Sequence, residues 1–350
     1  MTELKARAAT TKIEITRGGF ATRRTVKSER ATSDMGENKS VRRWSQASGA
    51  GVCTALLSMG LMAVVSMSTA ASAQRLTDQD IARYRTQIES GSIDERVAAA
   101  DVLGRRGANR RAEVVPLLRG RLRDDTEWRV RASSGRAIGR LAARAAVPDL
   151  VRALRDPVVD VRVVAAAALW RLPDPAAVQP LLELLRDQEA AARQWAALAL
   201  GVVRDRRATR PLITLLRDPE EDVRLDAIRS LGRLRDPGAL RALEAFSRNP
   251  DERMAERLEA VSSLSTLDGP GKVNALVRMV DFNDSQVRLR AIEALGRVGD
   301  ALVIPPLRQQ RGRERDASAR AVIDASIEQI QTRAAGGGSG GTPLNLPPLP

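Results

Sequence analysis

The sequence has no histidine and only one cysteine among its 350 residues. Without histidine, the chain cannot build a Ser-His-Asp or Cys-His catalytic arrangement or a His-ligated zinc, iron or copper site. A single cysteine excludes an internal disulfide, a CxxC redox pair and a thiolate cage for a metal. Aromatic residues make up 2% of the chain, too few for a platform that stacks nucleic-acid bases. We therefore expect a protein that is not an enzyme and holds no cofactor.

Lysine is also scarce, and only Lys272 lies after residue 73, so the positive charge of that part of the chain is almost entirely arginine. The formal net charge is +14 and the sequence pI is about 11.1. A nucleic-acid-binding surface would gather such charge on one face. In this sequence arginine alternates with acidic residues, which predicts a locally neutralised surface and no nucleic-acid partner. Examples of the alternation are Arg155-Asp156, Arg186-Asp187, Arg217-Asp218 and Arg235-Asp236.

Residues 1–73 have the pattern of an export signal. A polar, basic stretch over residues 1–47 is followed by an apolar, nearly uncharged stretch over residues 50–65, and Ala71-Ser72-Ala73 then precedes Gln74. This order is typical of a secretory signal peptide, and Met35 is a possible true start. The whole uncharged stretch, residues 47–74, is also long enough for an uncleaved membrane anchor. We expect cleavage, which predicts a periplasmic or envelope-associated bacterial protein that meets a membrane only if the segment is retained.

The body of the chain, residues 74–333, repeats itself at an almost constant period. An arginine recurs every 31 to 35 residues, and a helix-ending residue, most often glycine, follows it eight positions later. Such a period is the signature of a solenoid, in which stacked units share one continuous core. We therefore predict an all-α fold, an α-solenoid (superhelix) of about eight two-helix repeats. The repeated arginines are Arg96, Arg131, Arg162, Arg193, Arg224, Arg257, Arg288 and Arg320.

One central unit shows the two predicted helices. Apolar residues at helical spacing place the first helix over residues 158–172 and the second over 176–186. Asp156 is the expected N-cap of the first helix, and Pro157 its first residue. A Pro-Asp-Pro break at residues 173–175 separates the two helices. Three tryptophans occupy different phases of the repeat, which predicts local packing and no shared binding row; they are Trp128, Trp170 and Trp195.

With these features, residues 90–333 resemble HEAT repeats of the short bacterial type named after phycobilisome lyases. The resemblance rests on a proline in the second helix, an aspartate, and an arginine six residues after it, as in Pro148, Asp156 and Arg162. In that family such residues form a ladder of hydrogen bonds along the seam between repeats. The resemblance therefore implies a structural ladder made of Asp156, Arg162, Asp187, Arg193, Asp218 and Arg224.

The pattern weakens toward the C-terminal end, as expected for the caps of a solenoid. Asp251 and Arg257 keep the spacing, but their unit is two residues longer and has Ser265 where glycine usually stands. Near Arg288 the aspartate is displaced to Asp281 or Asp284, and near Arg320 its place is taken by Glu314. Residues 334–350 are predicted to be a Gly/Ser linker followed by a Pro-rich disordered tail.

A solenoid offers a concave face, which we expect the second helices to line. Aligned positions on those helices give no uniformly charged, acidic or aromatic row, and Arg210 with Arg241 is the nearest to a basic spot. We therefore predict a scaffold or adaptor that binds another protein and needs no catalytic group. The candidate partner-binding residues are Arg152, Gln179, Glu183, Arg210, Arg241, Asn274 and Arg278.

Three alternatives come from related HEAT-like proteins. The resemblance implies a bilin-lyase-like subunit or a chaperone for a chromophore protein, but such proteins act in the cytoplasm and a signal peptide argues against this role. HEAT-like iron hydroxylases need His-Glu metal pairs, which a sequence without histidine cannot supply. A nucleic-acid-binding HEAT-like protein is disfavoured by the signal peptide and by the neutralised arginines.

Overall fold

The computed structural model describes residues 75–335. The predicted signal peptide (1–73) lies outside the described residues, and so does the tail from residue 336 onward. Residues 75–335 contain α-helices and short 3-10 turns and no strand. Across this same range, no helix combines the length and the apolar character needed to cross a bilayer. The prediction of an all-α solenoid is confirmed.

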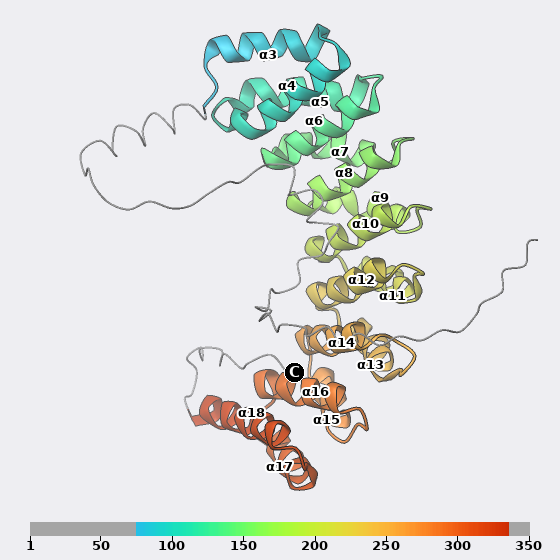
Figure 1. Cartoon of the computed structure of the whole chain (residues 1–350), viewed down its shortest axis with the longest axis vertical. Helices are drawn as coiled ribbons and strands as arrows, with labels where there is room; N and C mark the ends of the chain where they lie inside the picture. Colours follow the sequence, from blue (N-terminus) through green and yellow to red (C-terminus); the bar gives the residue numbers. More distant parts are fainter. Residues whose placement is uncertain (1–74, 336–350) are drawn as a thin grey trace, which may run out of the picture. The chain divides into compact units, whose positions relative to one another are not determined.

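Two sets of helices alternate along the chain (Figure 1). The helices that carry the repeated arginines, here called the first helices, are α4 (Ile93–Arg106), α6 (Trp128–Arg140), α8 (Val159–Arg171), α10 (Ala190–Val203), α12 (Glu221–Leu234), α14 (Met254–Thr266), α16 (Ser285–Val298) and α18 (Ala317–Ala335). The helices between them, here called the second helices, are α3 (Asp78–Ser90), α5 (Arg111–Asp124), α7 (Val147–Ala153), α9 (Val178–Leu184), α11 (Thr209–Thr214), α13 (Leu240–Arg248), α15 (Gly271–Arg278) and α17 (Ile304–Arg313).

Each first helix packs against the next first helix, so α4 to α18 form a continuous row. Each second helix packs mainly against the first helix that follows it, as α9 does against α10 and α13 against α14. The sequence pattern predicted that α8 and α9 form one unit. In the structure, the packed pair is a second helix and the first helix that follows it, such as α7 with α8. A 3-10 turn usually leads from a first helix to the next second helix, for example Pro175–Ala177 and Arg206–Ala208.

Small residues allow the first helices to approach one another closely. A Cβ added at Gly201 of α10 would lie 2.8 Å from the Oγ of Ser230 in α12. The same relation joins Gly232 of α12 to Ser263 of α14. Where glycine stands eight residues after a repeated arginine, as at Gly201 and Gly232, it is therefore a packing residue, because a side chain there would push two helices apart.

The buried apolar side chains form one continuous cluster from Leu76 to Ile330, as expected when each unit buries its neighbours' faces. Alanine and leucine dominate this core, which compensates for the lack of large aromatics. Trp170 and Trp195 pack edge to face across α8 and α10, with ring centroids 6.3 Å apart. The predicted local packing is confirmed for this pair.

The predicted start of the central first helix, Val158, is one residue early, and its predicted N-cap is wrong. Helix α8 begins at Val159 with Val158 as its N-cap, so Pro157 precedes the helix and Asp156 is not the cap. The Asp156 carboxylate instead accepts a hydrogen bond from the Val158 N–H at 2.9 Å. The second helix is likewise shorter than predicted: a 3-10 turn over Pro175–Ala177 leads into α9.

Candidate functional site

The repeated arginines bind carboxylates of the following unit. Arg162 Nε and Nη2 donate to the two carboxylate oxygens of Asp187 at 2.7 and 2.9 Å. Arg193 binds Asp218 in the same bidentate way, at 2.7 and 2.8 Å. In the regular units the aspartate six residues before the arginine contributes its carbonyl, as Asp156 O does to Arg162 Nη1 at 2.9 Å. Each arginine therefore ties its own helix start to the next unit.

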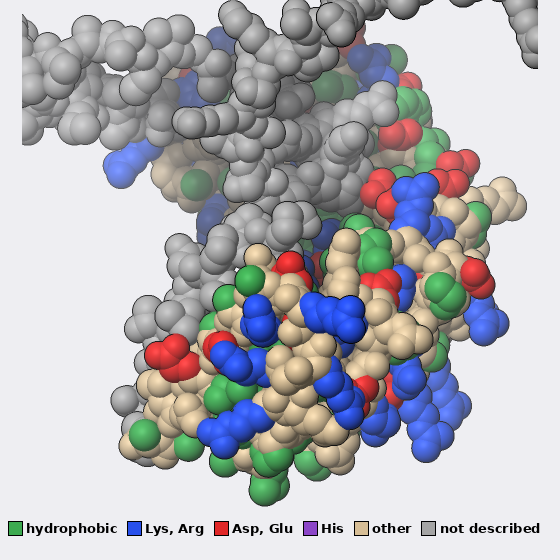
Figure 2. All heavy atoms as spheres, turned by 60° about the horizontal axis from the view of Figure 1, so that its bottom comes forward, with side chains coloured by type: hydrophobic (Ala, Val, Ile, Leu, Met, Phe, Trp, Pro, Cys, Tyr) green, Lys and Arg blue, Asp and Glu red, His purple; other side chains and the backbone are tan. Residues whose placement is uncertain are grey.

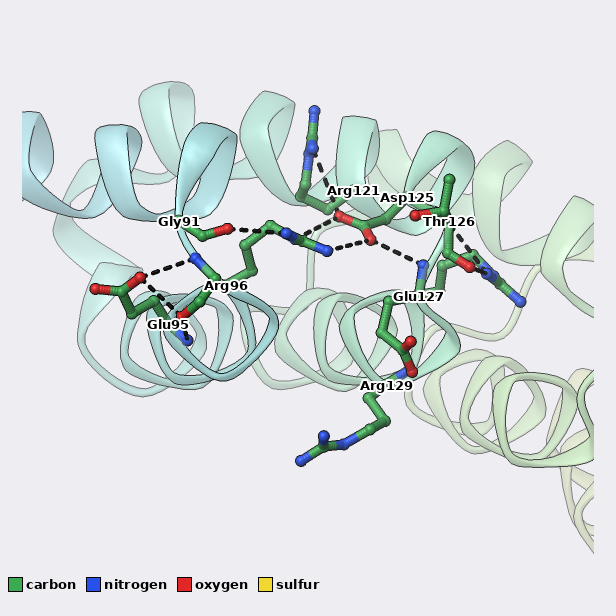
Figure 3. Close-up of polar contacts among 10 residues, drawn as sticks. Gly91, Glu95, Arg96, Arg121, Asp125, Thr126, Glu127 and Arg129 are labelled. Carbon is green, nitrogen blue, oxygen red and sulfur yellow. Dashed lines mark hydrogen bonds and ion pairs between the residues drawn. The ribbon is translucent and has the colours of Figure 1, made fainter.

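The first rung of this ladder shows the shared geometry (Figure 3). Arg96 donates to the Gly91 carbonyl at 2.8 Å and reaches the Asp125 carboxylate at 3.1 and 3.2 Å. Asp125 also accepts from the Glu127 N–H at 3.0 Å, just before α6 begins. The carboxylate thus serves the arginine of one unit and the helix start of the next.

The carboxylates of Asp187 and Asp218 stay ionised although they are largely withdrawn from water. Burial raises the pKa of Asp218, but the hydrogen bonds from Arg193 and from the Glu220 N–H outweigh it and hold the pKa below its ordinary value. The same balance, with Arg162 and the Glu189 N–H as donors, lowers the pKa of Asp187. Removal of either partner of an arginine–carboxylate pair would leave the other as a poorly hydrated, unpaired charge. We therefore assign the ladder a role in the stability of the fold.

The ladder changes its acid where the repeat is irregular. Arg224 binds Glu256, at 2.8 Å from Nη2, although Asp251 is the residue that keeps the Asp-Arg spacing of the repeat. The two extra residues of this unit place Asp251 on the exposed loop, and the longer side chain of Glu256 reaches the seam from inside α14. Arg257 next binds Asp284 at 2.9 Å, and Arg288 binds Glu314 at 3.0 Å.

The predicted partner-binding residues all lie on the second helices, and most are exposed. Arg152, Arg241 and Asn274 stand on α7, α13 and α15, respectively. Arg278 is engaged, because its guanidinium binds the carboxylate of Glu244 in α13 at 2.7 and 2.9 Å. These four residues are distributed over several helices and do not come together in one pocket.

The other three predicted residues line one groove between α9 and α11. Its volume is about 410 Å³. Gln179, Glu183 and Arg210 stand at its polar edge, and its apolar lining is Leu182, Leu185, Pro211 and Leu215. The hydrogen bond from Arg155 lowers the pKa of Glu183, so its charge is fixed and paired. The groove combines an apolar floor with exposed hydrogen-bonding groups, as sites for protein segments do.

Elsewhere the exposed arginines are commonly paired. On the face shown in Figure 2, with the C-terminal helices turned forward, lysine and arginine side chains are numerous and acidic ones lie among them. Arg311 of α17 pairs with Asp324, and Arg313 pairs with Asp281 at 3.1 Å. This arrangement agrees with a surface whose charge is neutralised locally.

A basic cavity on the first helices was not predicted, because the candidate residues were all on the second helices. The cavity, of about 630 Å³, lies beside the C-terminal ends of α12 and α14. The feature of the sequence that could have indicated this cavity is the irregular α14, which carries four hydroxyl residues between Ser262 and Thr266. Its charged lining residues are Arg204, Arg229, Arg233, Arg235, Glu259 and Lys272. Within residues 75–335, no three acidic or cysteine side chains are grouped as a metal site requires.

Comparison with known proteins identifies the repeats. The model of the HEAT-repeat family matches residues 82–170, 115–201, 149–225, 178–256 and 250–327. Among solved structures, the CpcE–CpcF complex of phycocyanin lyase from Nostoc sp. PCC7120 is 20% identical over 73% of this chain and 95% of that chain, with a TM-score of 0.42. YibA of E. coli is 19% identical over 80% and 99% of the two chains, with a TM-score of 0.49. An engineered protein is 18% identical over 77% and 81%, also with a TM-score of 0.49. No curated protein matches the sequence.

Proposed function

Because the chain belongs to the HEAT-repeat family, we propose that it is an interaction scaffold that binds another protein through the face formed by its second helices. The observation that carries this proposal is the groove between α9 and α11, where three residues chosen from the sequence meet around an apolar floor. We propose binding without catalysis, because the sequence supplies no histidine and one cysteine for the usual catalytic arrangements.

The groove indicates what kind of segment it would accept. Its leucines and Pro211 suit an apolar anchor side chain, since buried apolar anchors supply most of the energy of such contacts. Arg186 and Arg210 add positive charge, while the negative charge of Glu183 is already paired with Arg155. The proposed partner segment therefore presents an apolar side chain flanked by acidic residues.

Affinity capture from envelope fractions, after crosslinking, tests the proposal. The test variant is Leu182→Glu, which places a charge at the floor of the groove. The matched control is Arg152→Glu, which changes an exposed residue on α7 outside the groove. We expect a captured protein that is lost with Leu182→Glu and kept with Arg152→Glu. Equal capture by both variants would show that the groove is not the binding site.

We also propose export, for which the support is the signal pattern of residues 1–73. N-terminal sequencing of the protein from the same fractions should begin at Gln74. A cytosolic protein with residues 36–73 intact would contradict export and would favour the bilin-lyase-like alternative. In that case the purified chain mixed with a bilin should show a changed visible absorbance spectrum.

A further inference from the structure

The basic cavity beside α12 and α14 contains more positive charge than its acidic neighbours balance. Arg229 lies 3.3 Å from Asp226 and 3.6 Å from Glu259, so its charge is shared with two carboxylates. Arg235 pairs with Asp268 at 3.0 Å. These pairs account for two of the five cations that line the cavity.

The other three cations are not balanced by acids. Within the described range of 75–335, no carboxylate lies within 4 Å of Arg204, Arg233 or Lys272; the two arginines are exposed and Lys272 is partly buried. Lys272 donates to the Leu267 carbonyl at 2.7 Å, a neutral acceptor that leaves its charge uncompensated. Three positive charges therefore face one cavity from the end of α10, from α12 and from α15.

Cations often stand at helix C-termini because the last carbonyls there attract them. In this cavity hydroxyl groups bind those carbonyls instead. Thr266 Oγ1 lies 2.8 Å from the Gly232 carbonyl oxygen and 2.6 Å from that of Ser263, so its one hydroxyl hydrogen is shared between these two acceptors. Ser265 Oγ donates to the Ser262 carbonyl at 2.6 Å, and Ser262 Oγ to the Leu258 carbonyl at 3.0 Å. Within residues 75–335, neither Arg204 nor Arg233 pairs with a carboxylate, so these two arginines can bind another anion.

The backbone at two of the arginines adds an independent observation. Arg204 and Arg235 end α10 and α12 in the left-handed conformation, with φ of 59° and 58°. Glycine is the usual residue there, since a side chain makes this conformation unfavourable. Ala142, just after α6, has the same conformation with φ of 50°, so this conformation belongs to the helix ends of the repeat. Arginine rather than glycine at both positions places two guanidinium groups at the cavity.

We propose that this cavity binds the phosphate group of a small soluble molecule. A phosphate monoester carries nearly two negative charges and three strong acceptor oxygens, which suits several convergent cations better than a single carboxylate does. Guanidinium groups bind phosphate in a bidentate way. The volume of about 630 Å³ exceeds what a bare phosphate fills and falls in the range of small-molecule sites.

Titration calorimetry on the full chain at low salt, with inorganic pyrophosphate as the probe, tests this proposal. The test variant is the double substitution Arg204→Gln and Arg233→Gln. Its control is Arg217→Gln with Arg308→Gln, which removes the same charge from exposed positions outside both the cavity and the groove. We expect the test variant to bind pyrophosphate about tenfold more weakly or worse, and the control to bind within about twofold of the natural chain.

A second variant separates loss of the ligand from loss of the fold. Arg204→Gly removes a guanidinium but relieves the left-handed backbone, so its melting temperature should not fall while its pyrophosphate affinity does. No pyrophosphate binding by the natural chain, or equal affinities of the two double variants, would overturn the proposal. Binding to phosphatidylglycerol vesicles without binding to pyrophosphate would overturn the assignment to a soluble ligand. The groove between α9 and α11 is separate, so neither result bears on the proposed protein partner.

Discussion

The ladder predicts a large and specific loss of stability when one acid is removed. The Asp218 carboxylate holds Arg193 by two hydrogen bonds and accepts a third from the Glu220 N–H. The side chains of Arg193 and Asp218 are 12% and 4% exposed, so the remaining guanidinium of an Asp218→Ala variant would be largely dry. It would keep only its bonds to the Asp187 and Gln188 carbonyls, at 2.9 and 2.8 Å.

We estimate the cost from these contacts. Breaking a fully buried ion pair costs about 3–5 kcal/mol, and the partial exposure of Arg193 reduces this, while the lost bond to the Glu220 N–H adds about 1 kcal/mol. Asp218→Ala should therefore lower the free energy of unfolding by about 2–4 kcal/mol, measured by urea denaturation of the full chain followed by circular dichroism. The control Asp222→Ala alters an exposed aspartate in the first turn of α12 and should cost less than about 0.5 kcal/mol.

A double-mutant cycle isolates the pair itself. The variant with Arg193→Met and Asp218→Leu removes both charges and should recover most of the stability lost in Asp218→Ala, because no unpaired charge remains. If Asp218→Ala cost no more than Asp222→Ala, the ladder would be a consequence of the packing and not a contributor to it.

Three further predictions follow from the same structure. The pKa values of Asp187 and Asp218 are lowered in the folded state, so their ionised carboxylates stabilise the fold. This stabilisation is complete above the unfolded pKa of about 3.9 and is lost as the pH falls through the folded values. Acid titration should therefore show the free energy of unfolding decreasing below about pH 4. Gly201→Ala should lower the melting temperature because its Cβ would meet Ser230, whereas Gly120→Ala, which meets nothing within 4 Å, should gain up to about 1 kcal/mol from helix propensity. Leu212→Ala should cost about 2–5 kcal/mol in urea denaturation, since Leu212 is fully buried.

Much of the fold could be predicted because the repeat period can be counted from the recurring arginines of the sequence. The arginine period located every first helix, and the expected bounds of 158–172 differ from those of α8 by one residue at each end. The partner of each arginine could not be read with the same certainty. Arg162 has an aspartate six residues before it and another 25 residues after it, and only the packing of α8 shows that the later one, Asp187, receives the side chain.

Of the two candidate sites, the groove could be predicted from the sequence and the basic cavity could not. Gln179, Glu183 and Arg210 could be predicted because aligned helices repeat their exposed positions, and the structure brings these three residues together. The basic cavity could not be predicted, because its lining comes from the irregular unit at α14, where the alignment of repeats is poorest. Glu256 escaped prediction for the same reason, since a longer side chain one turn further along replaced the expected aspartate.

The claim that the second helices bind a protein partner has one direct test. A photo-crosslinking amino acid would be placed at Gln179 or Arg241 on the second helices, and at Arg129 or Arg233 on the first, all of them exposed positions. After irradiation of intact cells, the account predicts a crosslinked adduct of the same partner from Gln179 and none from Arg129 or Arg233. Adducts only from the first-helix positions would contradict it.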